Sequence, residues 1–317
     1  MDDLQLLLEQ VHSNLEENGY RARTVSTTHI KELQEEIERI HGQGLFNEKF
    51  YEEELAFFEF KAPESLPEAK TLIIVAIPQP QVRVTFNFHG KPRQVILPPT
   101  YKYGEDKRVL RILSEILCAH GYNVVQPKLP LRSVAGGKLP LKSLAVHRGL
   151  GRYGKNNICY IPGMGSFHRL TAFYTDCEFP EDNWQSFQVM QRCMNCEICL
   201  RSCPTGAICR DRFLIHAERC ITFHNEQSYT EFPIWINKSW HNSVVGCMRC
   251  QKVCPENSLF MNRTIDAEPF SEEETMLILN GTPEDHLPLE MSKKLDRLEL
   301  TGRMGILPRN LKVLLTQ

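Results

Sequence analysis

Apolar residues recur at helical spacing through the first forty positions of the chain. In residues 4–18 and again in 29–41, hydrophobic side chains return every three or four positions, with polar residues between them. This period predicts two amphipathic helices that each bury one face in a core. The apolar positions are Leu4, Leu7, Leu8, Val11 and Leu15 in the first stretch and Ile30, Leu33, Ile37 and Ile40 in the second.

The pattern becomes strand-like after residue 70. Residues 71–77 form a short apolar run rich in β-branched side chains, which predicts a buried strand. Residues 82–88 alternate, 89–92 break the pattern and 95–97 resume it, as in a β-hairpin. The remaining elements that the pattern predicts are a helix at 106–120, strands at 124–125 and 169–175, and helices in the last fifty residues.

Length and breaker residues suggest more than one domain. A chain of 317 residues exceeds the usual size of one domain, and segment 179–190 is polar enough to be a joint. We therefore expect an α+β protein with an α/β domain at 1–180, a second domain at 181–265 and a helical tail at 266–317.

Composition narrows the class of protein. A content of 42% hydrophobic and 24% charged residues is ordinary for a globular protein. No apolar run is long enough to cross a membrane, and the acidic N-terminus lacks the pattern of a secretory signal, so we expect a cytoplasmic protein without a membrane partner. The net charge of −2 disfavours tRNA as a partner without excluding it.

Cysteines are numerous and unevenly placed. Of the twelve, only Cys118 precedes residue 150. Clustered cysteines in a reducing compartment more often bind metal or do chemistry than form disulfides. The second half of the chain is therefore the place to expect a metal site.

Two cysteine motifs end in Cys-Pro. The first has the spacing C-x2-C-x2-C-x3-C-P and the second has C-x2-C-x3-C-P. In ferredoxins with two clusters, the cysteine before the proline serves the other cluster. That rule predicts two 4Fe-4S clusters, one held by Cys193, Cys196, Cys199 and Cys254, the other by Cys203, Cys247, Cys250 and one further ligand, for which Cys220 is the best candidate.

Cys220 completes the second set because Cys209 lies too close to Cys203 in the sequence. A four-cysteine zinc site is the alternative, since paired C-x2-C units often bind zinc. Zinc does not account for the third cysteine at x2 spacing, the two Cys-Pro endings or a total of eight thiolates. The other four cysteines, which we interpret as small buried apolar residues, are Cys118, Cys159, Cys177 and Cys209.

A glycine-rich loop precedes the cysteines. It fits G-x-G-x-x-G, but the preceding residues 141–148 read as a helix, whereas a dinucleotide fingerprint follows a strand. A P-loop is also disfavoured, because Asn156 stands where Ser or Thr would bind magnesium. A plain tight turn and a cofactor-binding loop both remain open. The candidate cofactor-binding residues are Gly149, Gly151, Gly154, Lys155 and Asn156.

The loop lies within a long stretch that lacks acidic residues. Residues 116–175 contain no Asp or Glu and eight basic residues, which suggests a wall suited to an anionic ligand. The basic residues are Lys128, Arg132, Lys138, Lys142, Arg148, Arg152, Lys155 and Arg169.

The order of these motifs resembles the epoxyqueuosine reductase family. The resemblance runs from about residue 65 to 257 and includes the glycine loop, both Cys-Pro motifs and the Glu-Arg-Cys-Ile context of Cys220. It implies a nitroreductase-like, cobalamin-binding N-terminal domain joined to a ferredoxin-like module with two 4Fe-4S clusters. It also implies that the cluster nearer the corrinoid reduces it, and it supports Cys220 as a ligand.

The chain departs from the family where an Asp-x-Gly-Pro segment supplies a proton donor. Here residues 134–140 read Val-Ala-Gly-Gly-Lys-Leu-Pro, without an acid. The substrate is therefore expected to differ from epoxyqueuosine, and another residue must donate the proton. The candidate catalytic residues are Lys138, Lys142, Tyr103 and Tyr153.

The leading hypothesis is a cobalamin-dependent iron–sulfur oxidoreductase. A low-potential donor of the ferredoxin or flavodoxin type would supply electrons, which the clusters pass to cobalt to form nucleophilic Co(I) for attack on a small molecule. Two alternatives stay open. In the first, the chain is an electron-transfer protein that activates the corrinoid of a partner protein. In the second, it is a flavin-linked reductase with the same architecture.

Overall fold

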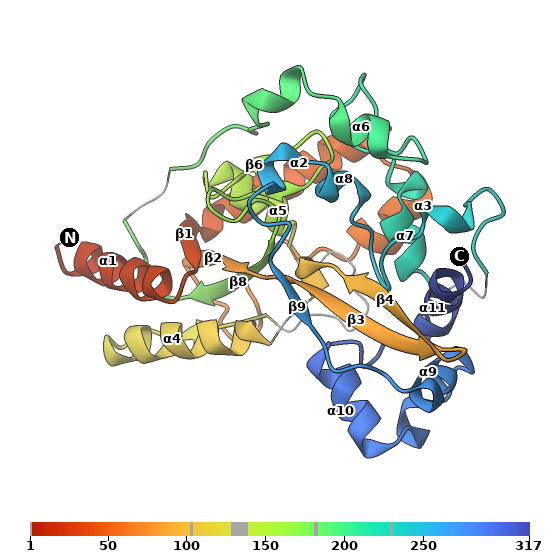
Figure 1. Cartoon of the computed structure of the whole chain (residues 1–317). Coiled ribbons are helices and arrows are strands. Elements are labelled where there is room, and N and C mark those ends of the chain that lie inside the picture. Colours follow the sequence, from red (N-terminus) through yellow and green to blue (C-terminus); the bar gives the residue numbers. More distant parts are fainter. Residues whose placement is uncertain (1, 102–103, 128–138, 181–182, 229–230) are drawn as a thin grey trace. The chain divides into compact units, whose positions relative to one another are not determined.

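The computed structural model describes residues 2–101, 104–127, 139–180, 183–228 and 231–317 (Figure 1). The chain forms two compact units, each built from two separate stretches. The first unit comprises Met1–Pro78 and Tyr103–Asn195. The second comprises Gln79–Lys102 and Cys196–Gln317. This division differs from the boundaries expected at residues 180 and 265, because the predicted hairpin belongs with the second half of the chain.

A four-stranded sheet forms the centre of the first unit, in the order β1-β2-β8-β5. All three pairings are antiparallel. This four-stranded sheet is therefore antiparallel, unlike the parallel sheet expected of an α/β domain. The strands are β1 (Arg21–Ser26), β2 (Thr71–Pro78), β5 (Val124–Val125) and β8 (His168–Thr175), of which the last three match the predicted strands.

Helices α1 (Asp2–Glu17) and α4 (Glu105–Ala119) contact each other beside this sheet (Figure 1). Val11 and Leu113 are fully buried in a shared core with Phe173 of β8. Full burial of such a side chain contributes about 1.5–3 kcal/mol. The apolar spacing therefore predicted these helices correctly. The unit also contains α2 (Ile30–Gly42), α3 (Glu48–Phe50) with a π-helical turn at Tyr51–Leu55, and α5 (Leu141–His147).

A buried ion pair joins α4 to β8. The guanidinium of Arg169 donates to Asp106 through Nε and Nη2, each at 3.1 Å from one carboxylate oxygen. Thr171 and Gln126 donate to the same carboxylate. Because four donors surround it, the buried charge of Asp106 is compensated.

The second unit contains a three-stranded sheet in the order β4-β3-β9. Strands β3 (Gln81–Phe88) and β4 (Lys91–Leu97) form the predicted hairpin, and β9 (Thr264–Asp266) pairs parallel to β3. His89 and Gly90 make the two-residue turn, with φ of 51° and 69°. Positive φ at both positions matches the right-handed twist of the hairpin.

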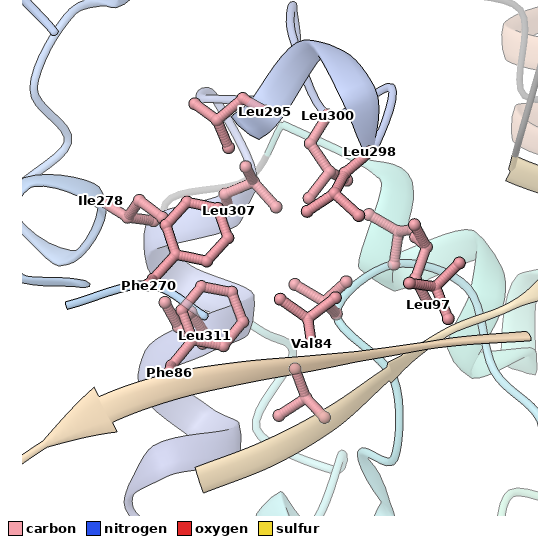
Figure 2. Packing of buried hydrophobic residues seen from close by; sticks show 14 of the residues in the cluster. Val84, Phe86, Leu97, Phe270, Ile278, Leu295, Leu298, Leu300, Leu307 and Leu311 are labelled. Carbon is pink, nitrogen blue, oxygen red and sulfur yellow. The ribbon is translucent and has the colours of Figure 1, made fainter. Parts of the chain in front are cut away.

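Helices from the C-terminus cover one face of this hairpin. Figure 2 shows Val84, Phe86 and Leu97 of the hairpin in one buried cluster with Leu307 and Leu311 of α11. The rings of Phe86 and Phe270 stack with their centroids 4.9 Å apart. Residues 266–317 are thus part of a core and not a tail. The helices are α9 (Glu272–Leu279), α10 (Leu289–Arg297) and α11 (Leu307–Leu315).

Candidate iron–sulfur and cofactor sites

Parts of the two Cys-Pro motifs lie against each other within the second unit. Cys199 lies in the short helix α6 (Ile198–Ser202) and Cys250 in α8 (Arg249–Lys252), and these helices are in contact. The hydroxyl of Ser202 donates to the carbonyl of Arg249 at 3.4 Å. Cysteines about fifty positions apart in the sequence are therefore brought to one place.

Three of the predicted ligands have extended backbone at the end of a helical turn. Cys203 has φ −81° and ψ 107°, and Cys254 has φ −73° and ψ 124°. A following proline excludes the α conformation, which is why each motif leaves its helix at this cysteine. Cys220 takes a similar conformation before helix α7 (Ile221–Glu226). These three cysteines therefore lie outside the helical turns that carry their neighbours.

The thiols of Cys203, Cys220 and Cys247 are near enough to influence one another electrostatically. Burial raises the pKa of Cys220 to about 11, and the neighbouring Cys247 and Cys203 contribute to this rise. Burial also raises the pKa of Cys247. Iron would have to replace the protons of the buried thiols, and its positive charge would then neutralise thiolates that burial alone disfavours.

None of the twelve cysteines forms a disulfide. Over the described residues, no three His, Cys, Asp or Glu side chains converge closely enough to hold a single metal ion. The predicted second-cluster ligands all belong to the second unit. In the predicted first cluster, Cys193 belongs to the first unit, and Cys196, Cys199 and Cys254 to the second.

The other four cysteines divide into two kinds. Cys159 and Cys177 are buried, as expected for small apolar residues. Cys118 is exposed and Cys209 is half-buried, so that interpretation is wrong for Cys118 and holds only in part for Cys209. Cys118 ends on the solvent side because it lies near the C-terminus of α4, beyond the buried stripe of that helix.

Internal packing accounts for the glycines of the glycine-rich loop. Gly149 ends helix α5 with φ of 65°. A Cβ on Gly151 would lie 2.7 Å from Cys159 Sγ, and one on Gly154 would lie 2.7 Å from the ring of Tyr160. The short hairpin of β6 (Arg152–Tyr153) and β7 (Cys159–Tyr160) causes these close approaches. A helix precedes the loop, as predicted, so the context of a dinucleotide fingerprint is absent.

Polar contacts fix the end of this loop. The amide of Asn156 is buried and donates to the hydroxyl of Tyr160 at 2.9 Å. The ammonium of Lys142 bonds the backbone and side-chain oxygens of Asn157, each at 3.0 Å. Asn156 is therefore part of the fold of the loop, and Lys142 holds the loop from helix α5.

Only two candidate proton donors lie in the described part of the chain. The hydroxyl of Tyr153 is 3.1 Å from Ser143 Oγ, and burial raises its pKa above the ordinary value. Lys142 is the exposed alternative, engaged with Asn157. Tyr103 and Lys138, together with Lys128 and Arg132 of the acid-free stretch, fall outside the described residues.

Two other basic residues of the acid-free stretch are structural. Arg148 is buried and donates through Nε to the carbonyl of Thr24, and Arg169 pairs with Asp106. Their charges are therefore directed into the protein. Within the described stretch, the exposed basic side chains are Lys142 and Arg152.

The segment before Cys193 is bonded to the glycine-rich loop. Tyr153 donates its N–H to Gln188 at 3.0 Å and accepts from Met190 at 2.9 Å. Cys193 in turn donates its N–H to Met190, also at 2.9 Å. The expected joint at 179–190 thus contains a fixed stretch that ties the loop to the first cysteine of the motif. No apolar period marks this stretch, so sequence reasoning missed it.

An aromatic stack fixes the start of the same segment. Trp184 lies between the imidazoles of His29 and His147, with centroid separations of 4.3 Å and 4.6 Å. His147 also contacts the carboxylate of Glu36 at 3.0 Å. Burial alone would lower the pKa of His147, but the hydrogen bonds to Glu36 and Gln185 and the charges of Glu36 and Glu32 together outweigh it, so the net shift is upward. A charged His147 therefore strengthens the contact between α5, which carries His147, and α2, which carries Glu36.

Comparison with known proteins agrees with the cysteine geometry. Residues 192–257 match the family model of a 4Fe-4S double cluster binding domain. The described residues include no helix of the length and apolarity that would let it cross a membrane. The chain is thus an iron–sulfur protein with a double-cluster domain in its second half.

Named relatives extend the match beyond the cysteines. The epoxyqueuosine reductase of Synechocystis sp. is 31% identical over 215 residues, which are 65% of this chain and 70% of that protein. The epoxyqueuosine reductase of Staphylococcus aureus is 27% identical, and the match covers 71% of this chain and 58% of that protein. The chain belongs to the epoxyqueuosine reductase family and is an oxidoreductase of this kind. Its matches span between 30% and 70% of the length of such relatives.

Solved structures support the fold. An epoxyqueuosine reductase from Bacillus subtilis superposes with a TM-score of 0.66 at 19% identity, over 98% of this chain and 82% of that one. A second epoxyqueuosine reductase, solved with an epoxyqueuosine-modified tRNA-Tyr stem loop, also gives 0.66 and covers 98% of this chain and 81% of that one. The mixed helix-and-sheet fold predicted from the sequence is thereby confirmed.

Proposed function

We propose that this protein is a reductase that passes electrons through two 4Fe-4S clusters to a corrinoid held in its first unit. When bound, the clusters would supply one-electron carriers, and the corrinoid would supply a metal that reacts with substrate. The observation that carries the proposal is the bonded path from Tyr153 of the glycine-rich loop through Met190 to Cys193. It makes the loop and the first cluster ligand parts of one rigid element.

The eight proposed cluster ligands fit thiolate chemistry. Cys203, Cys220, Cys247 and Cys250 would hold one cluster, in agreement with the mutual influence of the first three thiols. Cys193, Cys196, Cys199 and Cys254 would hold the other. Because each Cys-Pro cysteine leaves its own helical turn, exchange of these ligands between clusters is sterically natural.

His168 supports a ligand site in the first unit, which we propose is nitroreductase-like and cobalamin-binding. The side chain is buried, and Nε2 donates to the carbonyl of Cys159 at 3.0 Å. Burial lowers the pKa of His168 to about 4, so Nδ1 is a neutral acceptor at neutral pH. Nδ1 has no partner among the described residues. The amide side chains of a corrinoid carry N–H donors that suit such an acceptor.

The glycine-rich loop would then contribute to corrinoid binding through the side chain of Lys155. The glycines are explained by packing against β7, so Lys155 and His168 are the residues we propose to contact the corrinoid. Lys155 places a cation beside the loop, which suits the corrinoid phosphate. Of the described proton-donor candidates, Lys142 is preferred because burial keeps Tyr153 from ionising.

A tRNA carrying a modified base is the first substrate class to test, because a family member has been solved with such a stem loop. The absence of an acid between Val134 and Pro140 favours a substrate other than epoxyqueuosine. The same absence keeps a second candidate open, in which the protein reduces the corrinoid of a partner and turns over no substrate itself. In either case a ferredoxin or flavodoxin would supply the electrons.

Anaerobic titration with hydroxocobalamin tests the corrinoid site. We expect saturable changes in the visible spectrum. The His168→Leu variant should bind hydroxocobalamin at least tenfold more weakly, because a buried acceptor is lost. The exposed His120→Leu is the matched control and should bind like the wild type. A flat wild-type titration would contradict a resident corrinoid.

Reduced protein incubated with an epoxyqueuosine-modified stem loop then separates the candidates. Conversion of the nucleoside, measured by mass spectrometry, would identify the tRNA as substrate. It would also refute the proposal that the substrate is not epoxyqueuosine. Reduction of a partner's corrinoid without nucleoside conversion would support the electron-transfer role.

A further inference from the structure

Asn242 contacts the sulfur of a proposed cluster ligand. Its side-chain Nδ2 lies 3.1 Å from Cys247 Sγ, five positions further along the chain. This distance is short for an N–H···S hydrogen bond, whose acceptor is larger than oxygen. The contact therefore directs an amide proton at the sulfur atom that would bind iron.

The orientation of this carboxamide follows from its other partners. Oδ1 accepts from the backbone N–H of Met248 at 2.8 Å and from the hydroxyl of Ser243 at 3.0 Å. Because both partners are donors, the oxygen must face them and the nitrogen must face Cys247. The second proton of Nδ2 is directed at the carbonyl of Trp240, at 3.2 Å. Every hydrogen-bonding position of the amide is thus accounted for.

The surrounding backbone is rigid. Met248 and Ser243 are buried, and the carbonyl of Gly246 accepts from the buried amide of Asn225 at 2.7 Å. Gly246 has φ of 64°, and a Cβ there would lie 2.5 Å from the hydroxyl of Tyr101. The loop that carries Cys247 therefore has little freedom to move away from Asn242.

We propose that Asn242 is a positioning residue that sets the reduction potential of the second cluster through its hydrogen bond to Cys247. The inference rests on the proposed function, since it requires Cys247 to be a cluster ligand. Reduction adds one electron to the cluster from an external donor, and no bond to Asn242 forms or breaks. A fixed N–H dipole stabilises the more negative, reduced form, so it makes the cluster easier to reduce.

Removing the donor should make this cluster harder to reduce. In Asn242→Leu the one-electron reduction equilibrium should shift about tenfold toward the oxidised form, or about 59 mV. The isosteric Asn242→Asp keeps the acceptor for Met248 and places a negative charge by the sulfur, so its shift should be larger. Asn237→Leu is the control, because the Asn237 side chain accepts from the N–H and the hydroxyl of Ser239 and caps a short helix.

The measurement is an anaerobic dithionite titration of the loaded protein followed by electron paramagnetic resonance, with iron analysis of each variant. We expect one cluster to shift and the other to keep its potential, at about eight irons per chain. Unchanged potentials in both Asn242 variants at full iron content would overturn the inference. Loss of about four irons from both variants would also count against it, because Asn242 would then build the site.

The same samples separate this inference from the proposed function. A wild-type protein without iron–sulfur clusters refutes the proposed function itself. A wild-type protein with about eight irons, whose potentials do not respond to either Asn242 variant, refutes the role of Asn242 alone.

Discussion

Asn310 of α11 connects the C-terminal helix to the cysteine-bearing loop of the second unit. Its Nδ2 donates to the carbonyls of Asn225 at 2.8 Å and Val244 at 3.0 Å, and the residue is 1% exposed. Asn310→Ala would leave two buried carbonyls without donors. At about 1–3 kcal/mol for each unsatisfied group, the expected loss is about 2–6 kcal/mol, nearer the lower end if water enters the space.

Anaerobic urea unfolding, followed by circular dichroism and by the visible absorbance of the clusters, measures this loss. Asn310→Asp, which keeps the size but replaces both donors with acceptors, should destabilise at least as much. Lys312→Ala on the same helix is exposed and should change the free energy of unfolding by at most about 0.5 kcal/mol. If Asn310→Ala behaves like Lys312→Ala, the C-terminal helix does not support the loop as described.

Three further results are expected. Cys220→Ala should lower the iron content from about eight to about four per chain, whereas Cys209→Ala should leave it unchanged; equal contents would exclude Cys220 as a ligand. Burial, aided by Arg309 and Arg249, lowers the pKa of His241 to about 4. The unfolded chain, with a pKa of about 6.5, therefore binds more protons between these values, and stability should fall as pH falls from about 6.5 to 4. His241→Gln should reduce that slope in urea midpoints, and an unchanged slope would refute this role. Asp106→Ala should destabilise the first unit by about 3–5 kcal/mol, because Arg169 stays buried without a counter-charge; recovery in the double variant Asp106→Leu/Arg169→Met would support this cause.

The periodic elements were predictable because burial alone determines them. Leu8 and Val11 in α1, and Val109 and Leu113 in α4, lie at helical spacing. Strand β2 is apolar from Leu72 to Ile77, so the positions of these elements followed from the sequence. Strand β1 was missed because its residues Arg21 and Arg23 give it the polarity of a loop, although Ala22 and Val25 are buried. The local pattern of β1 does not reveal that the buried strand β2 pairs with it.

The division into units depended on pairings that lie far apart in the sequence. Val82 pairs with Ile265, and Phe86 stacks on Phe270. No residue near the hairpin indicates those partners. The hairpin was therefore expected in the domain at 1–180, whereas it belongs to the second unit. The cysteine motifs could be predicted from the local sequence, because their short spacing and the following prolines constrain the backbone.

The polar contacts of the sites were beyond sequence reasoning. The bond from Asn242 to Cys247 and the path from Tyr153 to Cys193 depend on the course of loops that have no periodic pattern. Glycine patterns were also ambiguous, since Gly151 and Gly154 suit both a ligand cradle and the tight hairpin that the structure contains.

Metal analysis of the protein purified without oxygen distinguishes two iron–sulfur clusters from a zinc site. We expect a brown protein with about eight iron and eight acid-labile sulfide atoms per chain and little zinc. A colourless protein that carries zinc in place of iron and sulfide would contradict this expectation.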